Sequence, residues 1–258
     1  MELICVPGAG GSARAYRPWA AALAPEFTVR ALDLPGRGQA ARETPAPTLV
    51  ETAAKLVERI PRDGPYALAG HSMGGLLVYE MARLICATDT LPRPEFVVVA
   101  GARPPHMISA AEFNRLVTTG DDDLLTGLVA LGFVDPTALQ SPMRALFVPS
   151  LRADLTLVAA YEPEPAEPLP VDLFAWYGLA DLTAPGTAVE EWARYAGAGF
   201  TTAAFPGGHD FPYERPPEVA ERLRAHRAST EDVPTTRRNH VGHDRPHPGP
   251  VRGLGPAA

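Results

Sequence analysis

The segment from Tyr66 to Leu84 constrains the fold of this chain more than any other part of it. It runs from the apolar stretch YALA through the motif GHSMG at 70–74 into an amphipathic stretch. A G-x-S-x-G motif between a strand and a helix predicts a sharp turn with the serine at its apex. Neighbouring backbone leaves no room for a Cβ atom at the two glycines, and the serine is expected in a strained conformation with its hydroxyl clear of the sheet.

Around this turn the chain alternates between strand-like and helix-like patterns. Strands are predicted at 3–6, 27–33, 66–69, 96–100, 173–178 and 201–205, and helices at 15–23 and 48–60. Thr48 and Glu51 have the spacing of a capping pair at the start of the second helix. Such an alternation predicts an α/β fold with a mostly parallel sheet, flanked by helices and joined by right-handed crossovers.

Between Gly101 and Pro170 the pattern changes to one of helices alone. Helical spacing is found at 110–118, 123–131 and 143–161. We therefore expect an inserted helical cap, at about 103–168, over the active-site edge of the sheet.

The overall composition excludes several classes of protein. The 258 residues are 46% hydrophobic and 21% charged, which suits one globular α/β domain. The net charge of −7 argues against nucleic acid or an anionic membrane as a general partner. The N-terminus has no basic region followed by a long apolar stretch, and Cys5 and Cys86 lie far apart. We expect a cytoplasmic monomer with free thiols, neither exported nor membrane-spanning.

The C-terminal end differs from the rest of the chain. From residue 226 it is rich in Arg, His, Pro, Thr and Gly, which predicts a domain over 1–225 and a disordered tail over 226–258. Neither a metal nor a cofactor is expected. The tail histidines have no rigid element to set ligand geometry, and three adjacent carboxylates do not converge on one ion, so Asp121–Asp123 are assigned to the first turn of a helix. The tail histidines are His226, His240, His243 and His247.

Two further polar residues follow predicted strands and complete a candidate catalytic triad. Asp181 follows the strand at 173–178 and His209 follows the strand at 201–205, at the ends where α/β sheets place their chemistry. With Ser72 they occur in the order Ser, Asp, His, which is the α/β-hydrolase order and differs from the orders of the serine proteases. We expect His209 to take the proton from Ser72, with Asp181 holding the imidazole.

Other residues near these motifs compete for the same roles. Asp172 and Asp210 are alternatives for the acid, although Asp172 precedes its strand and Asp210 adjoins the histidine itself. His71, inside the serine turn, is expected to pack against neighbouring loops.

The glycine loop PGAGGS at 7–12 is the second candidate part of the site. Its small residues let the backbone approach a substrate carbonyl, so the Ala9 N–H is a candidate oxyanion donor. The Met73 N–H, at the start of the helix after Ser72, is the other. The loop matches neither G-x-G-x-x-G nor G-x-x-x-x-G-K-[ST], which argues against a phosphate loop, and a plain tight turn remains an alternative.

Several motifs together resemble one enzyme family. They are PGAGGSARAYRPWA at 7–20, LPGRG at 34–38, GHSMGG at 70–75, GARPPH at 101–106, LRADLTLVAAY at 151–161, GLAD at 178–181 and FPGGHDF at 205–211. In this order they resemble the discrete type II thioesterases of polyketide and nonribosomal peptide biosynthesis, members of the α/β-hydrolase superfamily. The likeness runs from about residue 3 to about residue 225.

The resemblance implies a serine thioesterase that frees acyl groups, including stalled chains, from the phosphopantetheine arm of an acyl or peptidyl carrier protein. It implies Ser72 as nucleophile with Asp181 and His209, and Ala9 and Met73 as oxyanion donors. Three alternatives stay open. They are a carboxylesterase or lipase acting on small esters, a non-catalytic relative that only binds carrier protein or a small ligand, and cyclisation or condensation in place of hydrolysis.

The chain departs from the family pattern in two places. The family usually has a histidine at the position of Gly8, and a longer segment before the first motif. The second difference predicts a missing edge strand or a start assigned too late. The tail lies outside the likeness.

Overall fold

The computed structural model describes residues 1–88 and 91–231, and in this part of the chain six strands form one sheet. The strands are β1 (Glu2–Val6), β2 (Thr28–Ala31), β3 (Tyr66–His71), β4 (Phe96–Ala100), β5 (Asp172–Gly178) and β6 (Phe200–Phe205). Their order is β2-β1-β3-β4-β5-β6, and every neighbouring pair is parallel. The predicted parallel α/β architecture is confirmed.

The strand order places the site. The chain moves outward from β1 to β2 and then returns to the other side of β1 to form β3. The connections that follow β1 and β3 therefore leave the sheet in opposite directions, which opens a crevice at the carboxyl ends of these two strands. The glycine loop follows β1 and the serine turn follows β3, so both border this crevice.

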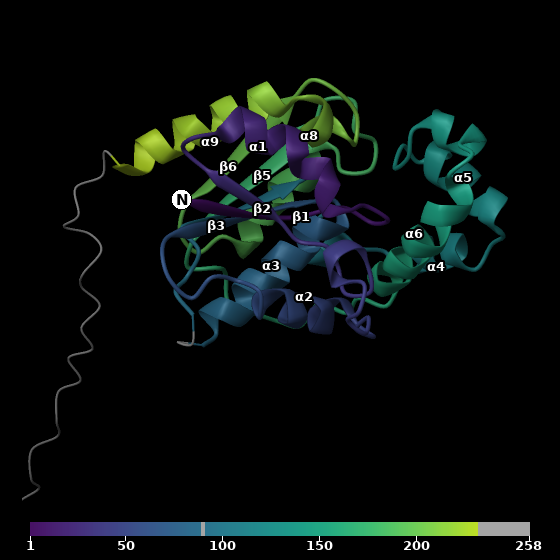
Figure 1. The fold of residues 1–258 in the computed structure, drawn as a ribbon, viewed down its shortest axis with the longest axis horizontal. Helices are drawn as coiled ribbons and strands as arrows, with labels where there is room; N and C mark the ends of the chain where they lie inside the picture. Colours follow the sequence, from purple (N-terminus) through teal and green to yellow (C-terminus); the bar gives the residue numbers. More distant parts are fainter. Residues whose placement is uncertain (89–90, 232–258) are drawn as a thin grey trace, which may run out of the picture.

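Helices cover both faces of the sheet (Figure 1). On one face lie α1 (Arg17–Leu23) and α9 (Pro216–Glu231), and on the other lie α2 (Leu49–Val57) and α3 (Met73–Cys86). Alternate residues of β1 enter the two cores, Leu3 and Cys5 on the α1 face and Ile4 and Val6 on the α3 face. Strands β3 and β4 are buried throughout, and for β4 the β-branched run at 96–100 predicts this.

The helix at 48–60 begins where the capping pair predicts. The Thr48 hydroxyl accepts the Glu51 backbone N–H at 3.1 Å, and α2 starts at Leu49, directly after Thr48. The helix predicted at 15–23 is divided in two, because a 3₁₀ turn, η1 (Ala13–Tyr16), precedes α1. A second short turn, η2 (Gly38–Ala40), closes the loop after β2.

The segment between β4 and β5 holds the three helices that the sequence predicts and, in addition, two short 3₁₀ helices. They are η3 (Pro105–Met107), α4 (Ala110–Val117), α5 (Asp121–Ala130), η4 (Pro136–Gln140) and α6 (Arg144–Ala159). Figure 1 shows α4, α5 and α6 together beside the carboxyl ends of the strands. Asp121, Asp122 and Asp123 occupy the first turn of α5, where carboxylates favour the helix dipole. We call residues 103–168 the cap.

The sequence patterns do not reveal the helices after β5. These are α7 (Gly186–Val189), η5 (Glu190–Tyr195), α8 (Phe211–Glu214) and α9. The proposed start of the tail at residue 226 needs correction, because α9 continues to Glu231 and the His226 ring lies 3.8 Å from that of Phe174. Pro216 begins α9, a position where the missing N–H costs nothing. The rest of the tail, with His240, His243 and His247, lies outside the described residues.

Cys5 is buried and Cys86 partly buried, and both are free thiols. Among the helices of the described ranges, none combines the length and the apolar character that crossing a membrane requires.

Candidate active site

The turn after β3 has the strained geometry that the G-x-S-x-G motif predicts. Ser72 has φ 54° and ψ −122°, the one positive φ among non-glycine residues in the described part of the chain. A Cβ atom at Gly70 would lie 2.0 Å from the Gly74 carbonyl oxygen, and one at Gly74 would lie 2.2 Å from the Val6 oxygen. Both glycines are required because backbone occupies the space of a side chain.

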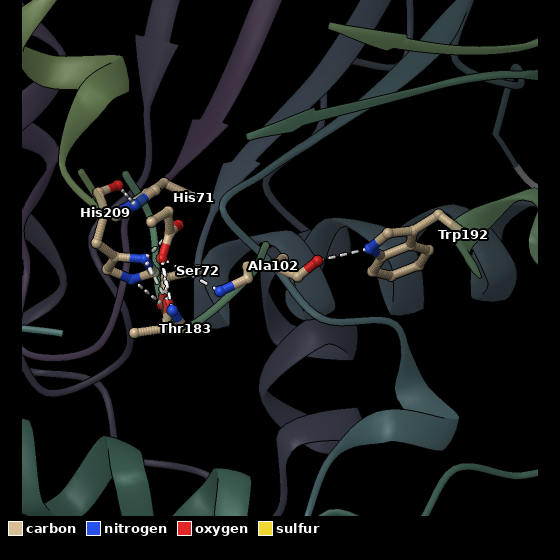
Figure 2. Close-up of polar contacts among 8 residues, drawn as sticks. His71, Ser72, Ala102, Thr183, Trp192 and His209 are labelled. Atoms are coloured by element: carbon tan, nitrogen blue, oxygen red, sulfur yellow. Dashed lines mark hydrogen bonds and ion pairs between the residues drawn. The ribbon is translucent and has the colours of Figure 1, made fainter. Parts of the chain in front are cut away.

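His209 lies beside the Ser72 hydroxyl, and Asp181 contacts the other nitrogen of its ring. His209 Nε2 is 3.0 Å from Ser72 Oγ, and His209 Nδ1 is 2.9 Å from Asp181 Oδ2. The serine comes from the turn after β3, the aspartate from the loop after β5 and the histidine from the loop after β6. Figure 2 shows His209, Ser72 and Thr183 gathered in one place. The structure thus brings together all three residues of the predicted triad.

The Asp181 carboxylate is held by more donors than the imidazole alone. Its Oδ1 atom accepts the Thr183 and Ala184 backbone N–H groups at 2.8 and 3.1 Å and the Thr183 hydroxyl at 2.7 Å. Burial raises the pKa of Asp181, but the bonds and charge of His209 and the bonds of Thr183 outweigh it and lower the pKa to about 2. The carboxylate is therefore ionised at neutral pH.

Thr183 is a site residue that the motifs do not reveal. Its Oγ1 lies 2.8 Å from His209 Nδ1 as well as 2.7 Å from Asp181 Oδ1, so it touches both partners. The only local signal is the D-x-T spacing, which is typical of an Asp side chain that bonds the backbone two residues on.

The competing aspartates do not contact the imidazole nitrogens. The Asp172 carboxylate accepts the Gly199 backbone N–H at 2.9 Å, at the opposite end of β5 from Asp181. Asp210 lines the cavity described below, and burial raises its pKa. Asp181 is therefore the carboxylate that geometry assigns to His209.

His71 packs against the loop of His209, as expected. It is buried, and its Nε2 lies 2.9 Å from the His209 carbonyl oxygen, which requires the proton on Nε2. Burial first, and then the neighbouring His209, lower the pKa of His71 to about 3. It therefore stays neutral and fixes the backbone of the loop that presents His209.

The glycine loop forms a tight turn facing the serine. The Gly11 N–H donates to the Gly8 oxygen at 3.0 Å, and Gly10 has φ +71°. Ala9 and Met73 both line the cavity, and within the described residues neither backbone N–H has a protein partner. At Gly8, where the resembled family has histidine, a Cβ atom would lie 3.2 Å from Ser72 Cβ.

A cavity of about 160 Å³ adjoins Ser72 and His209. Most of its wall is apolar and comes from α3 and the cap, namely Leu76, Ile108, Phe113, Leu128, Phe133, Val134, Leu151, Leu155 and Val158. Arg103 also lines it, but Glu112 holds that guanidinium with two bonds of 3.0 Å. Trp192 Nε1 donates to the Ala102 oxygen at 2.7 Å and fixes the wall after β4 (Figure 2).

No group of three or more metal-ligating side chains is found in the described ranges. The cavity combines an activated hydroxyl, a base and free backbone donors with an apolar wall, which suits attack on an acyl carbon that carries an aliphatic chain.

A family model, biosynthetic proteins and solved structures match this chain over most of its length. The family model for the thioesterase domain matches residues 1–226. The gramicidin S biosynthesis protein GrsT of Aneurinibacillus migulanus is 30% identical over 224 residues, which cover 86% of each chain. RedJ, a thioesterase of the prodiginine pathway in Streptomyces coelicolor, has 33% identity and a TM-score of 0.75 over 89% of each chain.

YbtT, a type II thioesterase of the yersiniabactin pathway, has 26% identity and a TM-score of 0.75 over 87% of this chain and 92% of its own. The parallel sheet and its flanking helices match the α/β-hydrolase fold of these thioesterase structures. The resemblance carried by the sequence motifs is confirmed, and the chain belongs to the thioesterase domain family, with type II thioesterases of polyketide and nonribosomal peptide pathways among its relatives.

Proposed function

We propose that this protein is a serine thioesterase that hydrolyses acyl groups from the phosphopantetheine arm of an acyl or peptidyl carrier protein. The observation that carries the proposal is the line of contacts from Ser72 Oγ through the His209 ring to Asp181, at 3.0 and 2.9 Å, on the wall of an apolar cavity. The thioesterase family and the type II relatives support the thioester substrate.

In the first half of the reaction Ser72 is acylated. His209 Nε2 takes the hydroxyl proton while Oγ attacks the thioester carbon, and Asp181 stabilises the imidazolium. The Ala9 and Met73 N–H groups hold the oxyanion of the tetrahedral intermediate, with the positive end of α3 behind Met73. The C–S bond then breaks, and the thiolate leaves with the proton from His209.

In the second half water enters and His209 acts as base again. The hydroxide attacks the acyl-serine ester, the same donors hold the second oxyanion, and Ser72 recovers its proton from His209 as the free acid departs. Thiols are good leaving groups, so protonation of the leaving group contributes less here than it does in amide hydrolysis. The apolar wall shelters the chain of the acyl group, and the cap covers it.

The test uses a carrier protein loaded with an acyl group through its phosphopantetheine arm. Mass spectrometry of the carrier, before and after incubation, is expected to show loss of the acyl mass with the wild-type enzyme. Ser72→Ala is expected to lower turnover by at least about 10⁴-fold because the nucleophile is gone. As a control for folding, the variant is expected to unfold at a temperature close to that of wild type. Undiminished turnover by Ser72→Ala would contradict the mechanism.

The alternatives differ in what the same assay records. An enzyme for small esters would show a higher kcat/KM on a nitrophenyl ester than on the loaded carrier. A cyclising or condensing enzyme would release a product lighter by one water than the free acid, or joined to an added nucleophile. A non-catalytic relative would bind the carrier and release nothing.

A further inference from the structure

A carboxylate from the cap reaches into the glycine loop. Asp154 lies on α6, and its side chain is only 1% exposed. Its Oδ2 accepts the Gly10 backbone N–H at 2.7 Å, across 144 residues of sequence. Gly10 directly follows Ala9, which lines the cavity. The cap therefore holds the peptide next to the proposed oxyanion donor.

The charge of Asp154 is balanced by a second loop. Arg37, in the loop after β2, donates Nη1 to Asp154 Oδ2 at 2.6 Å and Nη2 to Oδ1. Burying a carboxylate is costly unless it is paired and hydrogen-bonded, and an apolar pair in this place would generally support the fold equally well. The pairing with Arg37 thus keeps the Asp154 carboxylate charged and places its Oδ2 atom where it accepts the Gly10 N–H.

Leu151, one turn before Asp154 on α6, packs against the glycine loop and restricts its movement. A Cβ atom at Gly10 would lie 3.0 Å from Leu151 Cβ, so the loop packs closely against α6 and leaves little room for a side chain there. The turn formed by the bond from the Gly11 N–H to the Gly8 oxygen, 3.0 Å, needs its positive φ at Gly10. Leu151 and Leu155 of this helix also line the cavity.

We propose that Asp154 is a positioning residue for the oxyanion hole. By holding the Gly10 N–H it sets the glycine loop so that the Ala9 N–H points at the developing oxyanion. The helix that shelters the acyl chain then also completes the catalytic apparatus, so catalytic competence depends on α6 being in place. This inference rests on the proposed serine thioesterase mechanism.

The test compares Asp154→Asn with wild type on the loaded carrier. The asparagine has nearly the same shape but carries no charge for Arg37, so the loop is held less firmly. We expect kcat to fall by about 10- to 100-fold, somewhat less than the loss of a whole oxyanion donor, with KM within about twofold of wild type.

Two inhibitors distinguish positioning of the oxyanion hole from a purely structural role of Asp154, because only loss of positioning would change their relative affinities. A trifluoromethyl ketone analogue of the acyl-pantetheine forms a tetrahedral oxyanion on Ser72, and its Ki is expected to rise by the same factor as kcat falls. The matching unreactive amide analogue fills the cavity without an oxyanion, and its Kd is expected to stay within about twofold of wild type.

Two further variants separate positioning from stability. Glu80→Gln removes another buried carboxylate, which lies on α3. Its partners are Arg83 Nε at 2.7 Å and the Tyr161 hydroxyl at 2.6 Å, and neither residue belongs to the glycine loop. It is expected to destabilise the protein while keeping kcat and both inhibitor constants. The double variant Asp154→Leu with Arg37→Met restores stability through apolar packing and is expected to keep the low kcat.

The outcomes distinguish this inference from the function on which it rests. If wild type releases acyl groups, Ser72→Ala does not, and Asp154→Asn retains the wild-type kcat and trifluoromethyl ketone Ki, the positioning role is overturned and the thioesterase remains. A double variant with wild-type kcat overturns it equally. If wild type releases no acyl group from any carrier, the proposed function itself fails.

Discussion

The Thr183 hydroxyl lies where the aspartate and the imidazole meet. It donates to Asp181 Oδ1 at 2.7 Å and faces His209 Nδ1 at 2.8 Å, while Nδ1 also points at Asp181 Oδ2 at 2.9 Å. All three side chains are buried, which strengthens each of these bonds. The threonine therefore restricts both the carboxylate and the ring to the orientation in which Nε2 points at the Ser72 hydroxyl.

Replacing this hydroxyl with a methyl group tests its contribution. Thr183→Val is expected to lower kcat by about 2- to 10-fold with little change in KM, since one net hydrogen bond contributes about 0.5–1.5 kcal/mol. Thr183→Ser keeps the hydroxyl and is expected to retain most of the wild-type kcat. Steady-state kinetics on the loaded carrier measures both, and equal rates for Val and wild type would contradict the role.

At the scale of elements, the junction of β3 and α3 depends on the absence of side chains. The serine has its positive φ because the chain reverses from strand to helix within two residues. Gly74 lies against the Val6 and Pro7 carbonyl oxygens, 2.2 and 2.6 Å from where its Cβ would be. The turn after β3 is thus pressed onto the end of β1, and this contact brings the serine next to the glycine loop.

A single methyl group at this junction is expected to disrupt it. Gly74→Ala is expected to destabilise the protein by at least about 2 kcal/mol, because backbone has to move to admit the Cβ. Gly120→Ala is the matched control, since a Cβ there meets nothing within 4 Å. It is expected to cost less than about 1 kcal/mol. Urea unfolding measures the difference in stability between the two variants. Equal unfolding midpoints would show that a Cβ atom at Gly74 does not clash with the backbone.

At the scale of the whole molecule, two groups of the site link stability to pH. The pKa of His71 is lowered from 6.5 to about 3, chiefly by burial, and that of Asp181 is lowered from 3.8 to about 2. Between pH 6.5 and about 3 the unfolded chain protonates His71 and the folded chain does not. The stability that its neutral form confers is therefore present above pH 6.5 and lost as pH falls through this window. Asp181 contributes in the same direction at lower pH, above all between 3.8 and about 2.

We expect the free energy of unfolding to fall on acidification, with a contribution from His71 of up to about 1.4 kcal/mol per pH unit. His71→Gln carries no titrating group and is expected to show a shallower slope below pH 6.5. Some slope remains, because burial also lowers the pKa of His226. Urea unfolding across this range measures both slopes, and parallel curves for wild type and variant would contradict the assignment.

The sequence alone determined the elements and the chemistry of this protein. Strand and helix periodicities are local, so the six strands, the cap helices and the Thr48 cap could be predicted within a few residues. The positions of Asp181 and His209 just past their strands placed them at one edge of a parallel sheet together with Ser72. The short helices α7, η5 and α8 escaped prediction because proline-rich segments and single turns carry little periodicity.

Only the tertiary structure decided which groups hold that chemistry in place. Thr183 meets His209 across 26 residues, and Asp154 meets Arg37 and Gly10 across 117 and 144 residues. No local pattern specifies such pairs, because they depend on how the cap and three separate loops converge above the sheet. A motif states which residue types a reaction needs, whereas their orientation comes from neighbours that folding alone brings into contact.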